Sequence, residues 1–271
     1  MTYIIATFVF IFGVVIGSFL NVVALRYKTG RGLGGRSFCF SCGTPLKVYE
    51  LIPILSFVFQ KGKCRECRTP LSWQYPCVEF LTGTIFLLVY TKVVQNLPFV
   101  SLLEMPFYWF VFSLLIVISI YDLRHKIVPD LLAFLFGFSS LLWVLATHSV
   151  GYIGSLEGFL NIIAGLIFFV PFFLLWSLSR GQWMGLGDGK LVIGIGTLLG
   201  LAHGASAIIL GFWIAAGVSL VLLGLQKYVR LHIPFLKMTS EMPFAPFLVL
   251  GTFLAYYFAP DLLSINILLF S

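Results

Sequence analysis

Charged residues are scarce in this chain. They make up 10% of its 271 residues, whereas about 25% is usual in a soluble domain. Histidine is rarer still, with four residues that are scattered and form no ligand cluster. Low charge together with 60% hydrophobic residues excludes a water-soluble globule, and it excludes intrinsic disorder, which requires the opposite composition. A multi-pass helical membrane protein remains.

The hydrophobic residues are gathered in long runs, and a membrane-spanning helix needs roughly 20 apolar residues. We therefore predict an all-α polytopic membrane protein with about eight transmembrane helices. The runs lie near residues 3–25, 76–94, 104–121, 129–147, 157–178, 189–202, 205–226 and 244–260. The sixth run is short and rich in glycine, which makes it the weakest of the set. We find no internal repeat and no low-complexity tract.

Most of the positive charge lies in one segment. The chain has a net charge of +7, and residues 27–75 hold eight of its 17 Lys and Arg residues but two of its 10 Asp and Glu residues. Short positively charged loops stay in the cytoplasm, so we place this segment inside and both chain termini outside. Because the topology accounts for the basic charge, we expect membrane lipid, and no nucleic acid, as a partner.

Two Cys-x-x-Cys pairs stand in this cytoplasmic segment, Cys39 with Cys42 and Cys64 with Cys67. Their spacing is close to that of a zinc ribbon, and four thiolates complete a tetrahedral zinc shell with no open position. Disulfides are disfavoured in a reducing cytosol. We therefore predict a small zinc-ribbon-like insertion after the first helix that binds a structural zinc ion. The fifth cysteine, Cys77, is expected to be a small buried apolar residue.

Residues 30–35 match the pattern Gly-x-Gly-x-x-Gly, which in dinucleotide-binding proteins follows a strand and opens a helix. Here the stretch follows a membrane helix and precedes a cysteine pair. A flexible linker is the favoured interpretation, and contact with a phosphate or another ligand is the alternative.

Asp122 and Asp188 are the strongest candidates for chemistry, because acidic groups next to apolar helices are costly and are functional candidates by default. Asp122 ends the third predicted span, and Asp188 stands in Gly185-Leu186-Gly187-Asp188 at the entry to the sixth. Both are predicted at the cytoplasmic face. Two close carboxyl groups share a proton, so that one activates water while the other polarises a carbonyl. This is the chemistry of an aspartyl protease.

Each acidic residue also has a structural interpretation. Asp188 in a first helical turn is favoured by the helix dipole, and Asp122 can pair with a basic neighbour. Asp130 directly follows a proline and fits the start of a helix better than catalysis. Glu79, near the start of the second predicted span, is stabilised there by the helix dipole or contacts a basic or amine-bearing substrate.

Two other classes of protein compete with an enzyme. A transporter binds cations with buried acids, but here the acids are predicted at one membrane face, and no paired broken helices are evident. A zinc-ribbon scaffold would bind nucleic acid or a partner through the basic segment, whose charge the membrane topology already explains.

The sequence resembles the bacterial type IV prepilin peptidases over nearly its whole length. The shared elements are Gly17 to Val22, the two Cys-x-x-Cys pairs, Gly62 to Arg65, Asp122 with Val128-Pro129-Asp130, Gly185 to Asp188 with Lys190, and Pro243 to Pro246. Most of these elements are weak singly, but together and in this order they are highly specific. One departure is Ala245, which stands where a glycine is common in the family.

The resemblance implies a GxGD aspartyl endopeptidase of the bacterial inner membrane, with Asp122 and Asp188 as the catalytic pair facing the cytoplasm. It implies cleavage of the short basic leader of prepilins or pseudopilins, followed in many members by N-methylation of the new N-terminus with S-adenosylmethionine. The expected domains are residues 1–26, the first transmembrane helix; residues 27–75, the four-cysteine zinc-binding segment; and residues 76–271, the transmembrane peptidase domain. The sequence identifies no residue of the methyl-donor site.

Overall fold

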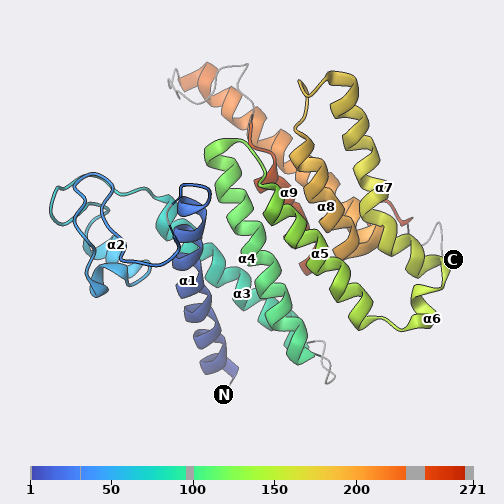
Figure 1. Cartoon of the computed structure of the whole chain (residues 1–271), viewed down its shortest axis with the longest axis horizontal. Helices are drawn as coiled ribbons and strands as arrows, with labels where there is room; N and C mark the ends of the chain where they lie inside the picture. The colour runs from blue at the N-terminus through green and yellow to red at the C-terminus, as the bar shows by residue number, and fades with distance from the viewer. Residues whose placement is uncertain (1, 31, 96–100, 230–241, 266–271) are drawn as a thin grey trace. The chain divides into compact units, whose positions relative to one another are not determined.

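The structure, a computed structural model, describes residues 2–30, 32–95, 101–229 and 242–265. Its regular elements in these ranges are helices (Figure 1), accompanied by two isolated β-bridges. In chain order the helices are α1 (Thr2–Arg26), η1 (Val48–Leu51), α2 (Leu55–Phe59), α3 (Gln74–Gln95), α4 (Ser101–His125), α5 (Asp130–Thr147), α6 (Val150–Ile153), α7 (Leu156–Ser179), α8 (Leu186–Val229) and α9 (Ala245–Phe258). The prediction of an all-α chain is confirmed for the described residues.

Among the described residues, six helices are long and apolar enough to cross a membrane, namely α1, α3, α4, α5, α7 and α8. The sequence predicted about eight spans, and the difference has two causes. First, α8 counts once although it is 44 residues long, and non-helical φ and ψ angles of 74° and −172° at Gly200 divide it into two helices. Second, α9 is apolar but has 14 residues, which is shorter than a full span.

A side chain of α7 stabilises the break in α8. Oδ1 of Asn161 accepts a hydrogen bond from the backbone N–H of Leu201 at 2.9 Å, and its amide donates to the hydroxyl of Tyr152. The accepting oxygen replaces the helical carbonyl that this N–H loses at the break. A Cβ atom on Gly200 would lie 2.8 Å from Asn161 Oδ1, and the positive φ angle also favours glycine. Both space and backbone conformation therefore require glycine at this position.

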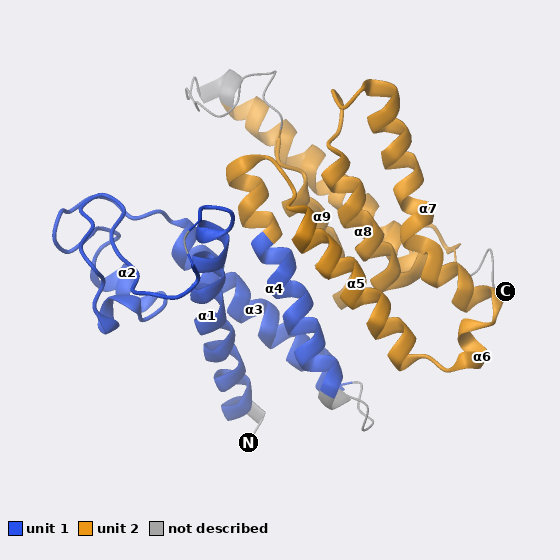
Figure 2. Cartoon of the chain, in the orientation of Figure 1, with its two compact units in different colours: residues 1–117 blue, residues 118–271 orange. Residues whose placement is uncertain are grey.

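The chain divides into two compact units, residues 1–117 and residues 118–271, and the boundary falls inside α4 (Figure 2). In the first unit α1 packs along α3, and Phe86 of α3 stacks on Trp109 with ring centroids 5.0 Å apart. In the second unit α8 packs against α5, α7 and α9, and Phe136 of α5 is fully buried. Each unit thus has its own helical core.

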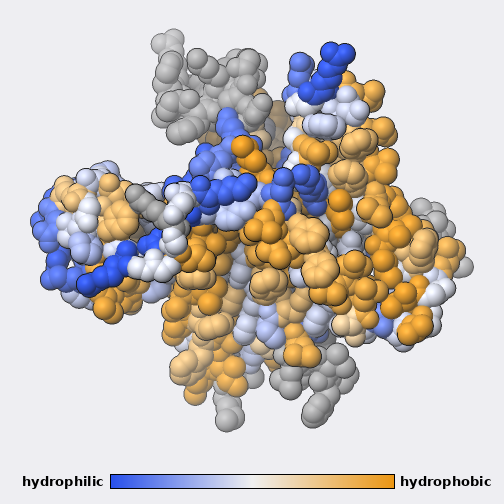
Figure 3. All heavy atoms as spheres, viewed as in Figure 1, coloured by the Kyte–Doolittle hydropathy of each residue, from blue (hydrophilic) through white to orange (hydrophobic). Residues whose placement is uncertain are grey.

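Apolar side chains cover most of the visible surface of α1 and α7, whereas the segment between α1 and α3 shows many hydrophilic side chains (Figure 3). Helices of this length with apolar outer surfaces match contact with lipid. The chain is therefore a multi-pass membrane protein, and its cysteine-bearing insertion follows the first helix as predicted.

Candidate functional site

Asp122 lies near the carboxyl end of α4 and is 4% exposed. Its Oδ2 accepts a hydrogen bond from the backbone N–H of Ala245 at 3.1 Å. Ala245 is the first residue of α9 and is itself fully buried. The N–H groups in the first turn of a helix have no partner inside the helix, so the start of α9 provides a donor that holds this carboxyl group in place.

Asp188 lies in the first turn of α8, and its backbone N–H donates to the carbonyl of Gly185. A Cβ atom on Gly187 would lie 2.8 Å from the Cβ of Val128. Glycine at position 187 therefore lets the start of α8 lie directly against the connection between α4 and α5. In this position the carboxyl group of Asp188 interacts electrostatically with that of Asp122. The structure thus brings the two predicted aspartates together within the second unit.

Asp130 takes the structural role that the sequence favoured. It is the first residue of α5 and follows the N-cap residue Pro129. Its Oδ1 lies 2.7 Å from Nζ of Lys190, and 74% of its side chain is exposed. An exposed ion pair of this kind contributes about 0–1 kcal/mol, so Asp130 joins α5 to α8 at the surface.

Sequence reasoning missed the contact between Asp122 and Ala245. The donor is a backbone N–H group, which no residue type identifies. The one available signal is the run Pro243 to Pro246, because proline is typical of the first positions of a helix. A helix start carries unpaired N–H groups, and these are natural donors to a buried acid.

The four cysteines of the two Cys-x-x-Cys pairs converge in the first unit. Their Sγ atoms all lie within 4.8 Å of one another, and the Sγ atoms of Cys39 and Cys67 are 3.8 Å apart. A tetrahedral zinc ion with Zn–S bonds of about 2.3 Å places its sulfur atoms about 3.8 Å from one another. The cluster can therefore bind a metal ion, and its four sulfur donors suit a metal that prefers thiolate ligands.

Each cysteine pair forms the same turn. In both turns the N–H of the first cysteine donates to the carbonyl of a threonine five residues later, and the residue after the second cysteine donates back to the first cysteine. The turns share the pattern Cys-x-x-Cys-x-Thr-Pro-Leu, at residues 39–46 and 64–71. The expectation of no internal repeat is therefore wrong, because a repeat as short as one turn escapes a search for repeated domains.

The repeat also identifies two residues that sequence reasoning missed. The hydroxyl oxygens of Thr44 and Thr69 lie 3.4 Å from Cys42 Sγ and 3.2 Å from Cys67 Sγ, respectively. Hydrogen bonds with the side chain and backbone of Thr69, together with those to Cys64 and Cys42, lower the pKa of Cys67 to about 6. A lowered pKa favours the thiolate, which is the form that binds metal ions.

Cys77 does not join the cluster. It is exposed in the first turn of α3, whereas Val78 and Glu79 are buried. Successive residues of a helix with about 3.6 residues per turn point in different directions, so burial of these two neighbours turns Cys77 outward. The prediction of a buried cysteine is wrong.

Residues 32–34 of the glycine-rich stretch present carbonyl oxygens to a cation. Nη1 of Arg26 donates to the carbonyls of Gly32, Leu33 and Gly34 at 3.1, 3.2 and 2.7 Å. A phosphate site would instead turn backbone N–H groups toward the ligand. These contacts of residues 32–34 with Arg26, the last residue of α1, favour the linker interpretation.

Two family models match separate parts of the chain. The bacterial peptidase A24 N-terminal domain matches residues 11–93, and the type IV leader peptidase family matches residues 109–221. The first match contains the four-cysteine cluster, and the second contains Asp122 and Asp188.

Curated relatives cover between 72% and 95% of the chain. A prepilin leader peptidase/N-methyltransferase of Bacillus subtilis (strain 168) is 32% identical over 263 residues, which is 95% of this chain and 96% of the relative. Proteins of the same name from Klebsiella pneumoniae and Aeromonas hydrophila are 30% and 27% identical, over 72% and 91% of this chain and 85% and 88% of the relatives. No solved structure matches the chain.

Proposed function

The chain belongs to the type IV leader peptidase family, and we propose that it is an aspartyl endopeptidase that removes the basic leader from type IV prepilins or pseudopilins. The observation that carries this proposal is that the carboxyl groups of Asp122 and Asp188 lie within electrostatic range of each other in one unit. The carboxyl group of Asp122 is buried and accepts a hydrogen bond from a backbone N–H group, and general acid–base catalysis relies on positioned side chains.

In the proposed reaction, Asp122 and Asp188 share one proton. The ionised carboxylate takes a proton from water, and the water oxygen attacks the scissile carbonyl carbon. The protonated carboxyl group meanwhile donates a hydrogen bond to the carbonyl oxygen. The carbon–nitrogen bond then breaks as the leaving amine takes up a proton. One water is consumed, the leader gains a carboxylate, and the mature pilin gains a free amine.

We place this site at the cytoplasmic face of the bacterial inner membrane. Basic charge that stays inside under the positive-inside rule is carried by residues 27–75, by Arg124 in the last turn of α4 and by Lys126 in the α4–α5 connection. Asp122 lies in the last turn of α4, next to that connection, and a basic leader is retained on the same side by the same rule. The basic segment is thereby assigned to membrane orientation and lipid contact, and no nucleic-acid partner is proposed.

We further propose that Cys39, Cys42, Cys64 and Cys67 hold a structural zinc ion. Support comes from the four-thiolate donor set and the 3.8 Å separation of two sulfur atoms. A closed shell of four thiolates leaves no position for a reacting water, so the ion would stabilise residues 27–75. This segment would form a module between the transmembrane helix at residues 1–26 and the peptidase domain at residues 76–271.

The second proposed activity is N-methylation of the new amine. Its support is the name of the relatives, which includes N-methyltransferase, and the methyl donor would be S-adenosylmethionine. When bound, this donor supplies an electrophilic methyl group. Cleavage supplies the acceptor, because the amine is free only after the peptide bond has been broken.

Mass spectrometry of a prepilin incubated with the purified protein in detergent tests both activities. We expect the wild-type protein to remove the leader, and to add one methyl group only when S-adenosylmethionine is present. Asp122→Asn and Asp188→Asn should abolish cleavage while zinc content and helicity stay unchanged. Asp130→Asn is the matched control, since it removes an exposed acid and should leave cleavage intact.

The outcome against the catalytic pair is equally definite. If either Asp122→Asn or Asp188→Asn cleaves at a rate comparable to wild type, the assignment of the pair is wrong. If folded, zinc-bound wild-type protein cleaves no prepilin, the peptidase proposal is wrong, and proton flux into liposomes becomes the next measurement.

A further inference from the structure

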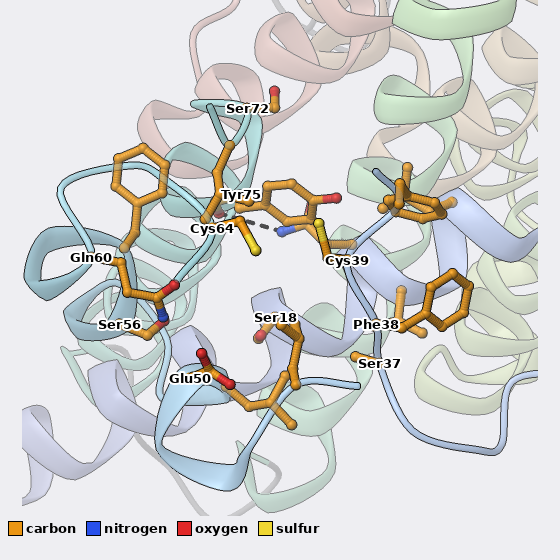
Figure 4. Close-up of a pocket in the computed structure, with 18 of the residues that line it drawn as sticks. Ser18, Ser37, Phe38, Cys39, Glu50, Ser56, Gln60, Cys64, Ser72 and Tyr75 are labelled. Atoms are coloured by element: carbon orange, nitrogen blue, oxygen red, sulfur yellow. Dashed lines mark hydrogen bonds between the residues drawn. The ribbon is translucent and has the colours of Figure 1, made fainter. Parts of the chain in front are cut away.

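The first unit contains a cavity of about 670 Å³ that the peptidase chemistry does not use. It is lined by the carboxyl end of α1, the start of α3 and the cysteine-bearing segment between them. Sites for small molecules usually measure about 300–1,000 Å³. In Figure 4, Ser18 and Glu50 lie on one side of an open space, and Tyr75, Cys39 and Cys64 lie on the other.

A buried carboxyl group lines this cavity. Glu79 of α3 is 6% exposed, and its Oε2 accepts a hydrogen bond from the backbone N–H of Ile54 at 2.7 Å. Within the described part of the chain, no Lys, Arg or His forms an ion pair with Glu79. A buried negative charge without a positive partner is costly. Arg26 also lines the cavity, and its guanidinium group donates to backbone carbonyls of residues 32–34. The charge of Glu79 itself is therefore complementary to a cationic group of a ligand.

The helix dipole does not explain this acidic residue. The favourable effect of the dipole is confined to about the first turn of a helix, and α3 begins at Gln74, with no acidic residue in its first turn. Of the two explanations that the sequence left open for Glu79, contact with a positively charged group is the one that the structure favours.

The other acidic residue of the cavity is already paired. Oε2 of Glu50 accepts a hydrogen bond from the backbone N–H of Lys47 at 2.7 Å, and its Oε1 lies 3.5 Å from Nε of Arg65. Glu79 is thus the acidic group of the cavity whose charge no basic side chain compensates in the described residues.

The remaining lining suits a flat polar ligand. Asn21 of α1 is 1% exposed; its amide donates to the carbonyl of Tyr75 at 3.3 Å, and its Oδ1 accepts from Gln74 at 3.1 Å. The aromatic rings of Phe38, Phe40 and Tyr75 also line the cavity. Aromatic faces stack on planar rings, so the site combines an anion, fixed amide groups and stacking surfaces.

We propose that this cavity binds S-adenosylmethionine, with the carboxylate of Glu79 facing its sulfonium and the aromatic rings facing its adenine. The assignment rests on the proposed N-methyltransferase activity, for which it supplies the donor site. When bound, the donor carries its methyl group on a positively charged sulfur, and its demethylated product is a neutral thioether. Glu79 therefore compensates a charge that the donor carries and the product lacks.

This difference in charge gives a direct test. Glu79→Gln in the full-length, zinc-bound protein keeps the size of the side chain and removes its charge. By equilibrium dialysis, we expect the affinity for S-adenosylmethionine to fall about tenfold or more, and the affinity for S-adenosylhomocysteine to change less than about twofold. Glu66→Gln is the matched control, because Glu66 is exposed and paired with Arg65, and it should change neither affinity.

Two results would overturn the assignment of Glu79. Equal losses for both ligands would mean that Glu79 supports the shape of the cavity, and unchanged affinities for both would mean that it does not face the donor. A second variant tests the cavity itself. Ser56→Trp places a large ring at a lining residue and should abolish binding of both ligands without loss of zinc, whereas retained binding would place the donor elsewhere.

Failure of this inference differs from failure of the proposed function. Methylation of the cleaved prepilin by the wild-type protein is measured without any Glu79 variant. If the wild-type protein methylates its product but Glu79→Gln binds both ligands normally, the donor site is wrong and the activity stands. If the wild-type protein neither binds S-adenosylmethionine nor methylates, the second activity and the donor site are both wrong.

Discussion

A methyl group on Gly187 has no room in the second unit. The added Cβ would lie 2.8 Å from the Cβ of Val128 and 3.2 Å from its Cγ2, whereas carbon atoms in contact prefer about 3.5–4.0 Å. The start of α8 would have to shift by about 1 Å to restore this spacing, and Asp188, the next residue, would move with it. Overpacking typically costs about 1–3 kcal/mol, and a misplacement of about 1 Å lowers a catalysed rate about 100-fold.

We therefore expect Gly187→Ala to lower the single-turnover rate of leader cleavage about 100-fold, with zinc content and helicity unchanged. Gly185→Ala is the matched control, because the nearest atom to its Cβ would be an Asp188 carboxyl oxygen at 3.9 Å, and most of the rate should remain. Adding Val128→Gly to Gly187→Ala removes the obstructing Cβ and should recover part of the rate. Val128→Ala removes only the more distant Cγ2 contact, keeps that Cβ and should recover less.

Two results would refute this steric reasoning. A wild-type rate from Gly187→Ala would show that the start of α8 accommodates a side chain without moving Asp188. An equal loss from Gly185→Ala would show that both glycines serve the approach of the substrate rather than the packing of α8 on the α4–α5 connection.

Three further substitutions test contacts that are seen in the structure and were not predicted from the sequence. Asn161→Leu removes the acceptor of a backbone N–H at the break in α8 and should destabilise the protein by about 1–3 kcal/mol, seen as a lower Tm in detergent; an unchanged Tm would contradict the capping role. Thr69→Val removes the hydroxyl beside Cys67 Sγ and should weaken zinc retention against a chelator about 10- to 100-fold, whereas equal retention would exclude that contribution. Ala245→Pro removes the N–H from which Asp122 accepts a hydrogen bond and should reduce cleavage, with helicity measured as the control for folding; full activity would mean that the contact is dispensable.

Much of the fold follows from composition, because a long apolar run in a membrane protein has little choice but to form a helix. The runs predicted near residues 3–25, 76–94 and 157–178 coincide with α1, α3 and α7. The position of the break in α8 could not be predicted from the sequence. It occurs at Gly200, one of 26 glycines in the chain, and what distinguishes it is Asn161 on another helix.

The candidate site also has features that the sequence predicts and features that it does not. The convergence of Cys39 with Cys67 was predictable, because ligand spacing within each pair is local and the number of cysteines is small. The membrane topology predicted Asp122 and Asp188 at one face, and the structure has them within electrostatic range; their catalytic roles stay a prediction. Thr69 was recognisable in principle from the repeated turn, which becomes clear only when the two cysteine pairs are aligned.

The two buried acidic residues of the described chain share one feature that no sequence pattern reveals: each accepts a hydrogen bond from a backbone N–H group. Asp122 accepts from the N–H of Ala245, and Glu79 accepts from the N–H of Ile54; within the described residues neither forms an ion pair. A basic side chain would fix each carboxyl group but would also neutralise it. A neutral backbone donor fixes its position and leaves most of its charge available. This arrangement is what the two proposals require, since Asp122 is proposed to exchange a proton and Glu79 to face a cationic ligand.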